Sequence, residues 1–174
     1  MAVADAPTNL NFLSPLGYKF ILSRAPNVEY FVQEVTLPGL NLGIAQQTSP
    51  FITIPHPGDR LEFEQMQVSF RVNEDLDNYL EIFNWMVALG RPESFTQYTL
   101  KAPLDSTNQQ KDTVTSDITL ILLSSAMNNN VEFRMNDCFP INLSNITMSS
   151  AGTDVDYVVA TATFALRNFT ITQL

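Results

Sequence analysis

Cysteine and histidine are almost absent from this chain of 174 residues, which contains one of each. The single cysteine, Cys138, excludes an intrachain disulfide framework. The single histidine, His56, lies between two prolines and has no cysteine or aspartate at metal-ligand spacing, so it is a poor metal candidate. A nucleophilic dyad of Cys138 and His56 is conceivable, but a buried structural thiol is the simpler interpretation of Cys138.

Motifs of catalysis and cofactor binding are also missing. The sequence contains no GxGxxG, no phosphate-binding P-loop and no GxSxG. Asp75 and Asp77 resemble a fragment of a calcium-binding loop, but the glycine and the terminal glutamate of that loop are absent. The two carboxylates suit the start of a helix better. We therefore expect no catalytic, metal or cofactor site and predict that the protein is not an enzyme.

Charge is scarce and mostly of one sign. Charged residues make up 16 % of the chain, whereas a soluble domain carries about a quarter. This shortage indicates that other subunits cover part of the surface. The 18 acidic and 9 basic residues give a net charge of −9, which argues against stable nucleic-acid binding. An acidic surface suits a protein that DNA must pass without sticking.

Long apolar runs and leader-like features are lacking as well. The first residues show no basic segment followed by a long apolar one, so we expect no secretory signal. No run approaches the roughly 20 apolar residues that span a bilayer. We expect a protein that is made and kept in a cytoplasm and has no membrane contact.

What the chain does contain is a dense series of short strand patterns. Hydrophobic residues make up 45 % of it, which favours one folded domain with a sizeable core. We expect an arm at residues 1–14 and a single domain at residues 15–174. Short strands between turn signals predict a mainly β protein, an antiparallel sandwich or barrel with one α-helix. The expected strands are residues 18–23, 29–35, 60–72, 117–124, 131–135, 139–148, 155–166 and 169–174, with the first two forming a β-hairpin.

Residues 40–54 form an unusual segment between two turn signals. Leu37-Pro38-Gly39 precedes it and residues 55–60, with Pro57-Gly58, follow it, and both have type II turn chemistry with glycine at positive φ. Residues 46–50 divide the segment into two halves, which predicts a long two-stranded excursion with unpaired edges. An ordinary hairpin folded onto its own sheet is an equally good alternative. The candidate residues for contacts between subunits and between rings are Leu40, Leu42, Ile44, Phe51, Ile52 and Ile54.

One helix is predicted, and it begins at Asn73. Asn73 is a good N-cap, and acidic residues follow it where the helix dipole favours them. Gly90 as the C′ residue and Pro92 give the expected end. Helical spacing predicts one apolar stripe that covers the β core: Leu76, Tyr79, Leu80, Phe83, Met86 and Val87. The following residues 91–116 form a long polar connection.

Two stretches of the chain resemble the tail tube protein family of contractile-tailed phages (myoviruses). In the first, Leu37-Pro38-Gly39 precedes the excursion, Gly58-Asp59-Arg60 leads into a strand, and Asn73-Glu74-Asp75 opens the helix that carries Trp85. In the second, Phe139-Pro140 begins a strand and residues 157–169 form a closing strand without charge from 157 to 166. The order and spacing of these features carry the resemblance, which includes related tube-initiator and baseplate proteins.

The resemblance implies a virion structural protein of the phage tail that is assembled in the host cytoplasm. It implies hexameric rings whose subunits join their strands into one continuous barrel around a DNA channel, and a role for residues 40–54 in stacking one ring on the next. Sheath and baseplate proteins are the implied partners. Phage DNA would pass through the lumen without specific binding, and no cofactor is implied.

Alternatives of two kinds remain at this point. A tube initiator, a baseplate hub adaptor or a tail terminator of the same fold would match the same residues, and only its copy number in the virion would differ. A monomeric β-barrel that binds a small apolar ligand also combines short strands with one helix. Such a barrel would purify as a closed monomer together with its ligand.

Overall fold

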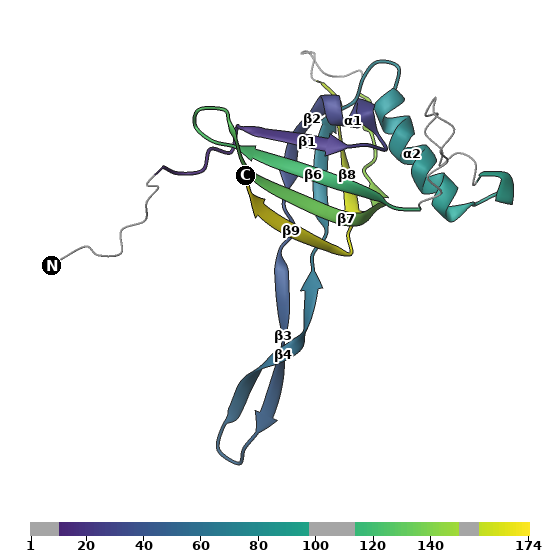
Figure 1. Cartoon of the computed structure of the whole chain (residues 1–174). Coiled ribbons are helices and arrows are strands. Elements are labelled where there is room, and N and C mark those ends of the chain that lie inside the picture. Colours follow the sequence, from purple (N-terminus) through teal and green to yellow (C-terminus); the bar gives the residue numbers. More distant parts are fainter. Residues whose placement is uncertain (1–10, 98–113, 150–156) are drawn as a thin grey trace.

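The computed structural model describes residues 11–97, 114–149 and 157–174 of the chain (Figure 1). It confirms the mainly β, antiparallel architecture and adds a short helix to the one expected. The predicted division into an arm at 1–14 and a domain at 15–174 stays a prediction. In chain order the elements are β1 (Tyr18–Leu22), α1 (Pro26–Phe31), β2 (Val32–Thr36), β3 (Leu40–Thr48), β4 (Thr53–Phe63), β5 (Met66–Arg71), α2 (Asp77–Gly90), β6 (Ser116–Leu123), β7 (Asn129–Leu143), β8 (Val159–Ala165) and β9 (Asn168–Gln173).

The body consists of two antiparallel sheets that share the long strand β7. The first sheet has the order β1-β6-β7-β9, and the second has the order β7-β8-β5-β2. Residues 129–138 pair with β6, whereas residues 139–143 pair with β8. Asp137, at φ 54°, lies where the strand passes from one sheet to the other. The two strands expected at 131–135 and 139–148 are therefore one strand, which ends at Leu143.

The core lies between the two sheets and under α2. The predicted alternation along β5 is confirmed, because Met66, Val68 and Phe70 are buried opposite small or aromatic residues of β8. The first sheet adds Phe20, Leu22, Ile118, Leu120 and Met135. Trp85 of α2 packs on Phe164, with ring centroids 6.1 Å apart, and its Nε1 donates to the Val114 carbonyl at 3.1 Å. The helix thereby closes one side of the sandwich (Figure 1).

The hairpin expected from residues 18–35 does not exist. β1 pairs with β6 and β2 pairs with β5, so the two strands belong to the edges of different sheets. Between them lies α1, with Pro26 in its first turn, where the fixed φ of proline suits a helix. The Glu29 carboxylate of this helix accepts a hydrogen bond from the Leu22 amide at 3.2 Å, which ties the helix to the end of β1.

Both predicted glycine turns are wrong. Neither Gly39 nor Gly58 has a positive φ, and residues 55–60 lie inside β4. Prolines fit this strand because a two-stranded ribbon leaves one edge of each strand without a partner. At Gly39 an added Cβ would lie 2.6 Å from a carboxylate oxygen of Glu64, which is the movable end of a flexible side chain. The strand expected at 60–72 is also divided, because the chain passes from β4 into the body at residues 64–65.

Helix α2 begins and ends later than expected. Its N-cap is Leu76, and Asn73 acts from a distance, since its side-chain oxygen accepts from the Asn78 amide at 3.4 Å. Arg91, not Gly90, adopts the left-handed conformation at the C-terminus, where its amide donates to the Val87 carbonyl at 2.7 Å. Most of the 91–116 connection lies outside the described residues.

The apolar stripe predicted for α2 is wrong in its position on the helix. The buried residues are Asn78, Ile82, Trp85 and Ala88. Of the predicted stripe, Tyr79 and Met86 pack at the margin of the core, whereas Leu76, Leu80 and Phe83 are exposed. The helix is apolar on two opposite sides, so its periodicity alone could not indicate which side meets the core.

Candidate assembly surfaces

The hairpin β3–β4 projects from the body as a separate two-stranded sheet (Figure 1). This confirms the predicted two-stranded excursion and not the alternative of a hairpin folded onto its own sheet. Its base is fixed to the body by the Phe63 ring, which meets the Phe169 ring of β9 with centroids 5.5 Å apart. The Glu64 amide also donates to the Gly39 carbonyl at 3.0 Å. Beyond this base almost every side chain is exposed.

The two faces of the hairpin differ in chemistry. Directly opposed residues of antiparallel strands share a face, so the cross-strand register sorts the side chains. One face carries the pairs Leu40–Phe63, Leu42–Leu61, Ile44–Pro57 and Gln46–Pro55. The other face carries Asn41–Glu62, Ala45–His56 and Gln47–Ile54, and there the His56 ring contacts the Gln47 side chain at 3.0 Å. The first face also carries Thr48–Thr53 near the tip, so the hairpin has one face that is apolar from its base to Ile44 and one largely polar face.

The sequence-predicted contact residues divide among three places. Leu40, Leu42 and Ile44 come together on the apolar face, Phe51 and Ile52 lie at the tip between the strands, and Ile54 lies on the polar face. Leu61 and Phe63 also belong to the apolar face, with the two prolines of β4, and were not among the predicted residues. The alternation of Leu61 and Phe63 is visible in the sequence, but Pro57-Gly58 favours a turn at residues 55–60, which separates these two residues from the excursion.

A close approach of two backbones occurs halfway along the hairpin. Between the pair Leu42–Leu61 and the pair Ile44–Pro57, β3 has one residue and β4 has three, so β4 bulges. Gly58 lies so near Gly43 that an added Cβ on Gly58 would overlap the Gly43 backbone. Bulges increase local twist, and the two strands cross in Figure 1.

Within the described residues, the first sheet ends in two strands that pair on one side only, β1 and β9. Neighbouring strands in this sheet alternate in direction, so β1 and β9 run in opposite directions. Unpaired strand edges present backbone groups to other chains. On β9, Ile171 is 59 % exposed although its cross-strand partner, Phe133, lies against the core. Both edges are therefore open to a further strand.

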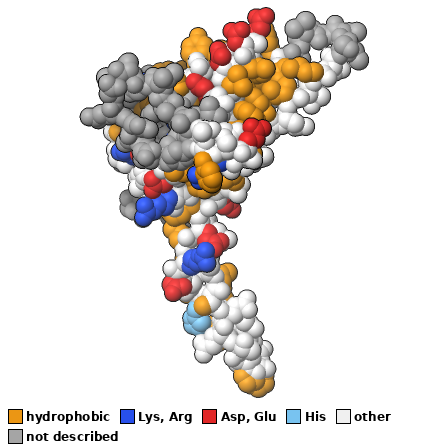
Figure 2. Space-filling model, turned by 90° about the vertical axis from the view of Figure 1, so that its right-hand side faces the viewer, with side chains coloured by type: hydrophobic (Ala, Val, Ile, Leu, Met, Phe, Trp, Pro, Cys, Tyr) orange, Lys and Arg blue, Asp and Glu red, His pale blue; other side chains and the backbone are white. Residues whose placement is uncertain are grey.

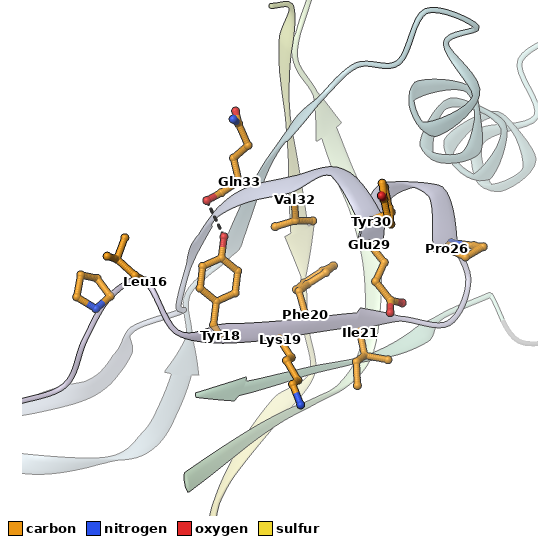
Figure 3. A pocket seen from close by; sticks show the side chains of 11 residues that line it. Leu16, Tyr18, Lys19, Phe20, Ile21, Pro26, Glu29, Tyr30, Val32 and Gln33 are labelled. Carbon is orange, nitrogen blue, oxygen red and sulfur yellow. Dashed lines mark hydrogen bonds between the residues drawn. The ribbon is translucent and has the colours of Figure 1, made fainter. Parts of the chain in front are cut away.

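A groove of about 810 Å³ follows the open edge of β1 (Figure 3). Phe20 of β1 and Val32 of β2 point toward each other across it, and the Tyr18 hydroxyl donates to the Gln33 carbonyl at 2.6 Å. Burial, and then the nearby Glu34 carboxylate, raises the pKa of Tyr18, which keeps this hydroxyl a donor. Lys19 and Ile21 point to the other side of the strand (Figure 3). The groove thus lies at a sheet edge, and its lining combines apolar residues such as Phe20 and Val32 with polar ones such as Glu29 and Gln33.

Charges on the outward face of the first sheet are balanced. Register places Lys19, Glu132 and Arg134 on this face with several threonines, and Asp117 forms an ion pair with Arg134 at 3.4 Å. This face thus carries two basic and two acidic residues, although the net charge of the whole chain is −9. The acidic excess must lie on other surfaces.

Nucleophilic and metal chemistry find no support in the described part of the chain. Cys138 lies in β7 and His56 on the hairpin, so they do not form a dyad. Burial, followed by the Asp117 charge, raises the pKa of Cys138 to about 12, so the thiol stays protonated. Among the described residues no three His, Cys, Asp or Glu side chains gather as a metal site. No described helix is long and apolar enough to cross a bilayer.

Comparison with known proteins covers nearly the whole chain. Residues 6–172 match the model of a family described as phage tail tube protein. A search of curated protein sequences finds no match.

Solved structures of contractile systems share the fold. The cap that terminates the tube of the anti-feeding prophage is 13 % identical with a TM-score of 0.61, over 100 % of both chains. A chain from the baseplate of the same particle is 12 % identical with a TM-score of 0.59, over 89 % of this chain and 90 % of that one. A chain from the extended sheath–tube complex of the extracellular contractile injection system PVC is 12 % identical with a TM-score of 0.59, over 93 % and 92 %.

Proposed function

The chain belongs to the phage tail tube protein family, and we propose that six copies of it form a ring and that stacked rings build the tube of a contractile tail. The observation that carries this proposal is the pair of open edges, β1 and β9, on one four-stranded sheet. The ring would close when β9 of each copy pairs with β1 of the next.

Strand direction supports this closure. Because four strands alternate in direction, β9 of one copy and β1 of the next meet antiparallel, and the sheet continues without interruption. Closure removes every free edge of the sheet. Six copies of four strands give a barrel of about 24 strands, and barrels of that size are wide enough to enclose a channel.

Side chains beside the two edges also complement each other. Ile171 lies on the inward side of β9, and Phe20 lies on the inward side of β1 within the groove. In the proposed ring, Ile171 of one copy would enter the groove of its neighbour and lose its contact with water. Burial of such a side chain contributes about 1.5–3 kcal/mol.

The hairpin would connect rings along the tube. A two-stranded ribbon is marginally stable alone, and the apolar face with Leu40, Leu42 and Ile44 needs a cover. A neighbouring ring provides one when the hairpin lies along it. In this proposal the apolar face of the hairpin makes the contacts between rings, and Ile54, which lies on the polar face, does not.

The outward face of the first sheet would line the channel. Its balanced charges and threonines offer phosphates no basic surface to bind. DNA would therefore pass without specific binding, because this face has only two basic residues among those described, and one of them, Arg134, is paired with the Asp117 carboxylate. In this proposal the sheath and the baseplate surround or adjoin the rings, and the protein resides in the virion tail after assembly in the host cytoplasm.

The protein could be a repeating subunit or an initiator or terminator at one end of the tube, because tube, cap and baseplate chains share this fold. A repeating subunit occurs in many rings per tail, whereas an initiator or terminator occurs in one. We favour the repeating subunit because of the hairpin, which connects one ring to the next. A monomeric ligand-binding barrel is not favoured, since β1 and β9 leave the first sheet open.

Electron microscopy and sedimentation of the purified protein test the proposal. We expect rings that stack into tubes as concentration rises, and many copies per virion by quantitative mass spectrometry. A protein that stays monomeric at high concentration and is absent from virions would contradict the ring. A single ring per virion would instead identify an initiator or terminator.

A further inference from the structure

The second sheet also has two edges, and both are irregular. Within the described residues, β2 pairs with β5 alone and residues 139–143 of β7 pair with β8 alone. The register shifts between Val32 and Glu34 on β2, and again between Pro140 and Asn142 on β7. By contrast, β1 and β9, the edges of the first sheet, each keep one register over their whole paired length. One sheet therefore has two regular edges and the other has two interrupted edges.

Gln33 is the extra residue at the shift in β2. Two steps along β2 match one step along β5 there, so the strand bulges at Gln33. The Gln33 carbonyl accepts the hydrogen bond from the Tyr18 hydroxyl across the groove, at 2.6 Å (Figure 3). With the side-chain amide oriented so that its oxygen faces Arg71, that oxygen accepts from the guanidinium Nε and Nη2 at 2.5 and 2.9 Å. Groups of the same subunit thus occupy both oxygens of Gln33, and we name Gln33 with Tyr18 and Arg71 the Gln33 cluster.

Arg71 is itself held in position. Its Cζ lies 4.8 Å from the centre of the Tyr157 ring, a distance at which a guanidinium is attracted to an aromatic face. Tyr18 is fixed by the pairing of β1 with β6, where it lies opposite Leu122. The cluster therefore joins the bulge of β2 to residues from three other parts of the body.

An added strand needs a regular row of free backbone groups. Proteins protect sheet edges with bulges, prolines and charged side chains. The β2 edge has the bulge at Gln33 and the exposed Glu34 beside it, and the β7 edge has Pro140. We propose that the Gln33 cluster prevents strand addition at the β2 edge, so that a second copy joins through the first sheet. The cluster thereby determines which of two neighbouring edges is used, since β1 and β2 both line the same groove.

The consequence for assembly rests on the proposed function, in which β9 of one copy must pair with β1 of the next. A strand added to β2 would extend the second sheet and leave the edges of the first sheet open. Copies joined in that way would not close the ring. The protection of β2 can nevertheless be measured in a protein that forms no ring.

The variant Tyr18→Phe/Arg71→Ala removes both bonds to Gln33 and keeps the aromatic ring at position 18. It is made in an Ile171→Lys background, which blocks the β1–β9 joint of the proposed ring. We expect sedimentation velocity to show that the triple variant associates at a concentration about tenfold or more below that of Ile171→Lys alone. Amide hydrogen exchange should slow with rising concentration at those β2 amides that do not pair with β5, because an added strand pairs them.

Two controls in the same background separate the cluster from a general loss of stability. Tyr30→Phe/Arg60→Ala makes the same chemical changes at exposed residues. Tyr30 lines the same groove, and Arg60 lies on the hairpin, which projects below the body in Figure 2. Ser69→Ala removes the hydrogen bond between the Ser69 and Thr161 hydroxyls, 3.0 Å long, within the second sheet. Neither control should associate more than Ile171→Lys alone, and urea unfolding of dilute protein should confirm that all variants are folded.

Exchange of the β2 amides that is independent of concentration in the triple variant would overturn the proposal, and so would equal association of either control. If Ile171→Lys itself forms rings, the β1–β9 joint fails, while exchange of the β2 amides in the triple variant still decides the role of the Gln33 cluster. If the triple variant does not fold, Tyr18→Phe in the same background is measured instead, with the same outcomes for and against the proposal.

Discussion

Gly43 and Gly58 oppose each other at the bulge of the hairpin, and they are not equivalent. A Cβ on Gly58 would overlap the Gly43 backbone, whereas a Cβ on Gly43 would meet only the Arg60 carbonyl at an ordinary 3.6 Å. Backbone cannot move aside as a flexible side-chain end can. The close approach therefore requires glycine at position 58 but not at position 43.

We expect Gly58→Ala to disrupt pairing in the outer half of the hairpin and to leave the body intact. Amide hydrogen exchange in β3 and β4 should accelerate. The free energy of unfolding of the body, measured with urea, should change by less than about 0.5 kcal/mol. Gly43→Ala is the matched control and should retain slow exchange. Equal behaviour of the two variants would contradict the asymmetry described above.

The buried Cys138 thiol should make the stability of the protein depend on pH in the alkaline range. Its folded pKa is about 12 against an ordinary 9.0, so the unfolded chain releases its thiol proton first as pH rises. The stabilisation is complete below about pH 9 and is lost between about pH 9 and 12, by up to about 1.4 kcal/mol per pH unit. The free energy of unfolding, measured with urea, should therefore fall more steeply above pH 9 in the wild type than in Cys138→Ala. Parallel profiles would count against a buried neutral thiol.

At the scale of the element, the hairpin presents two matched positions on opposite faces. Leu42 lies on the apolar face and is 49 % exposed, and Ile54 lies on the polar face and is 42 % exposed. The register also determines where a deletion must be made. A deletion of residues 42–51 would leave most of β4 without a partner, whereas a turn placed between Leu42 and Leu61 preserves the base.

We expect Leu42→Ser to raise the protein concentration needed for tube formation about tenfold, because a leucine that the neighbouring ring would cover is exchanged for a polar group. Ile54→Ser should change that concentration little. Light scattering and electron microscopy measure both. If Ile54→Ser is the more damaging substitution, the polar face is the one that stacks.

At the scale of the whole molecule, the proposed ring depends on β9 meeting β1. Ile171 and Thr172 are adjacent on β9, but their side chains point to opposite faces of the sheet. Ile171 would enter the neighbour's groove, and Thr172 would face the channel. The two positions thus separate ring closure from the channel surface.

We expect Ile171→Lys to yield a folded monomer by sedimentation velocity, since the charged lysine would lose its hydration beside Phe20 and Val32 of the neighbour's groove. Thr172→Lys should still form rings and should gain affinity for DNA, which a basic surface binds in a salt-dependent manner. Rings of Ile171→Lys with normal stability would refute the β1–β9 joint while leaving the family assignment unaffected.

Local sequence pattern by itself determined much of this protein. The alternation along β5 predicted its buried face, and the apolar residues 40–54 between their turn signals predicted a projecting two-stranded segment. These features follow from side-chain periodicity and composition, which neighbouring residues encode.

Only the tertiary structure decided which strands pair, which glycines need space and which face of α2 is buried. Tyr18 pairs with Leu122, Gly58 meets Gly43, and Trp85 packs on Phe164, and each of these contacts joins residues that are distant in sequence. A local pattern offers several compatible partners, for instance two apolar faces on one helix. The choice among them depends on packing in three dimensions, which buries one face of the helix against the core and leaves Leu80 and Phe83 on the other face exposed.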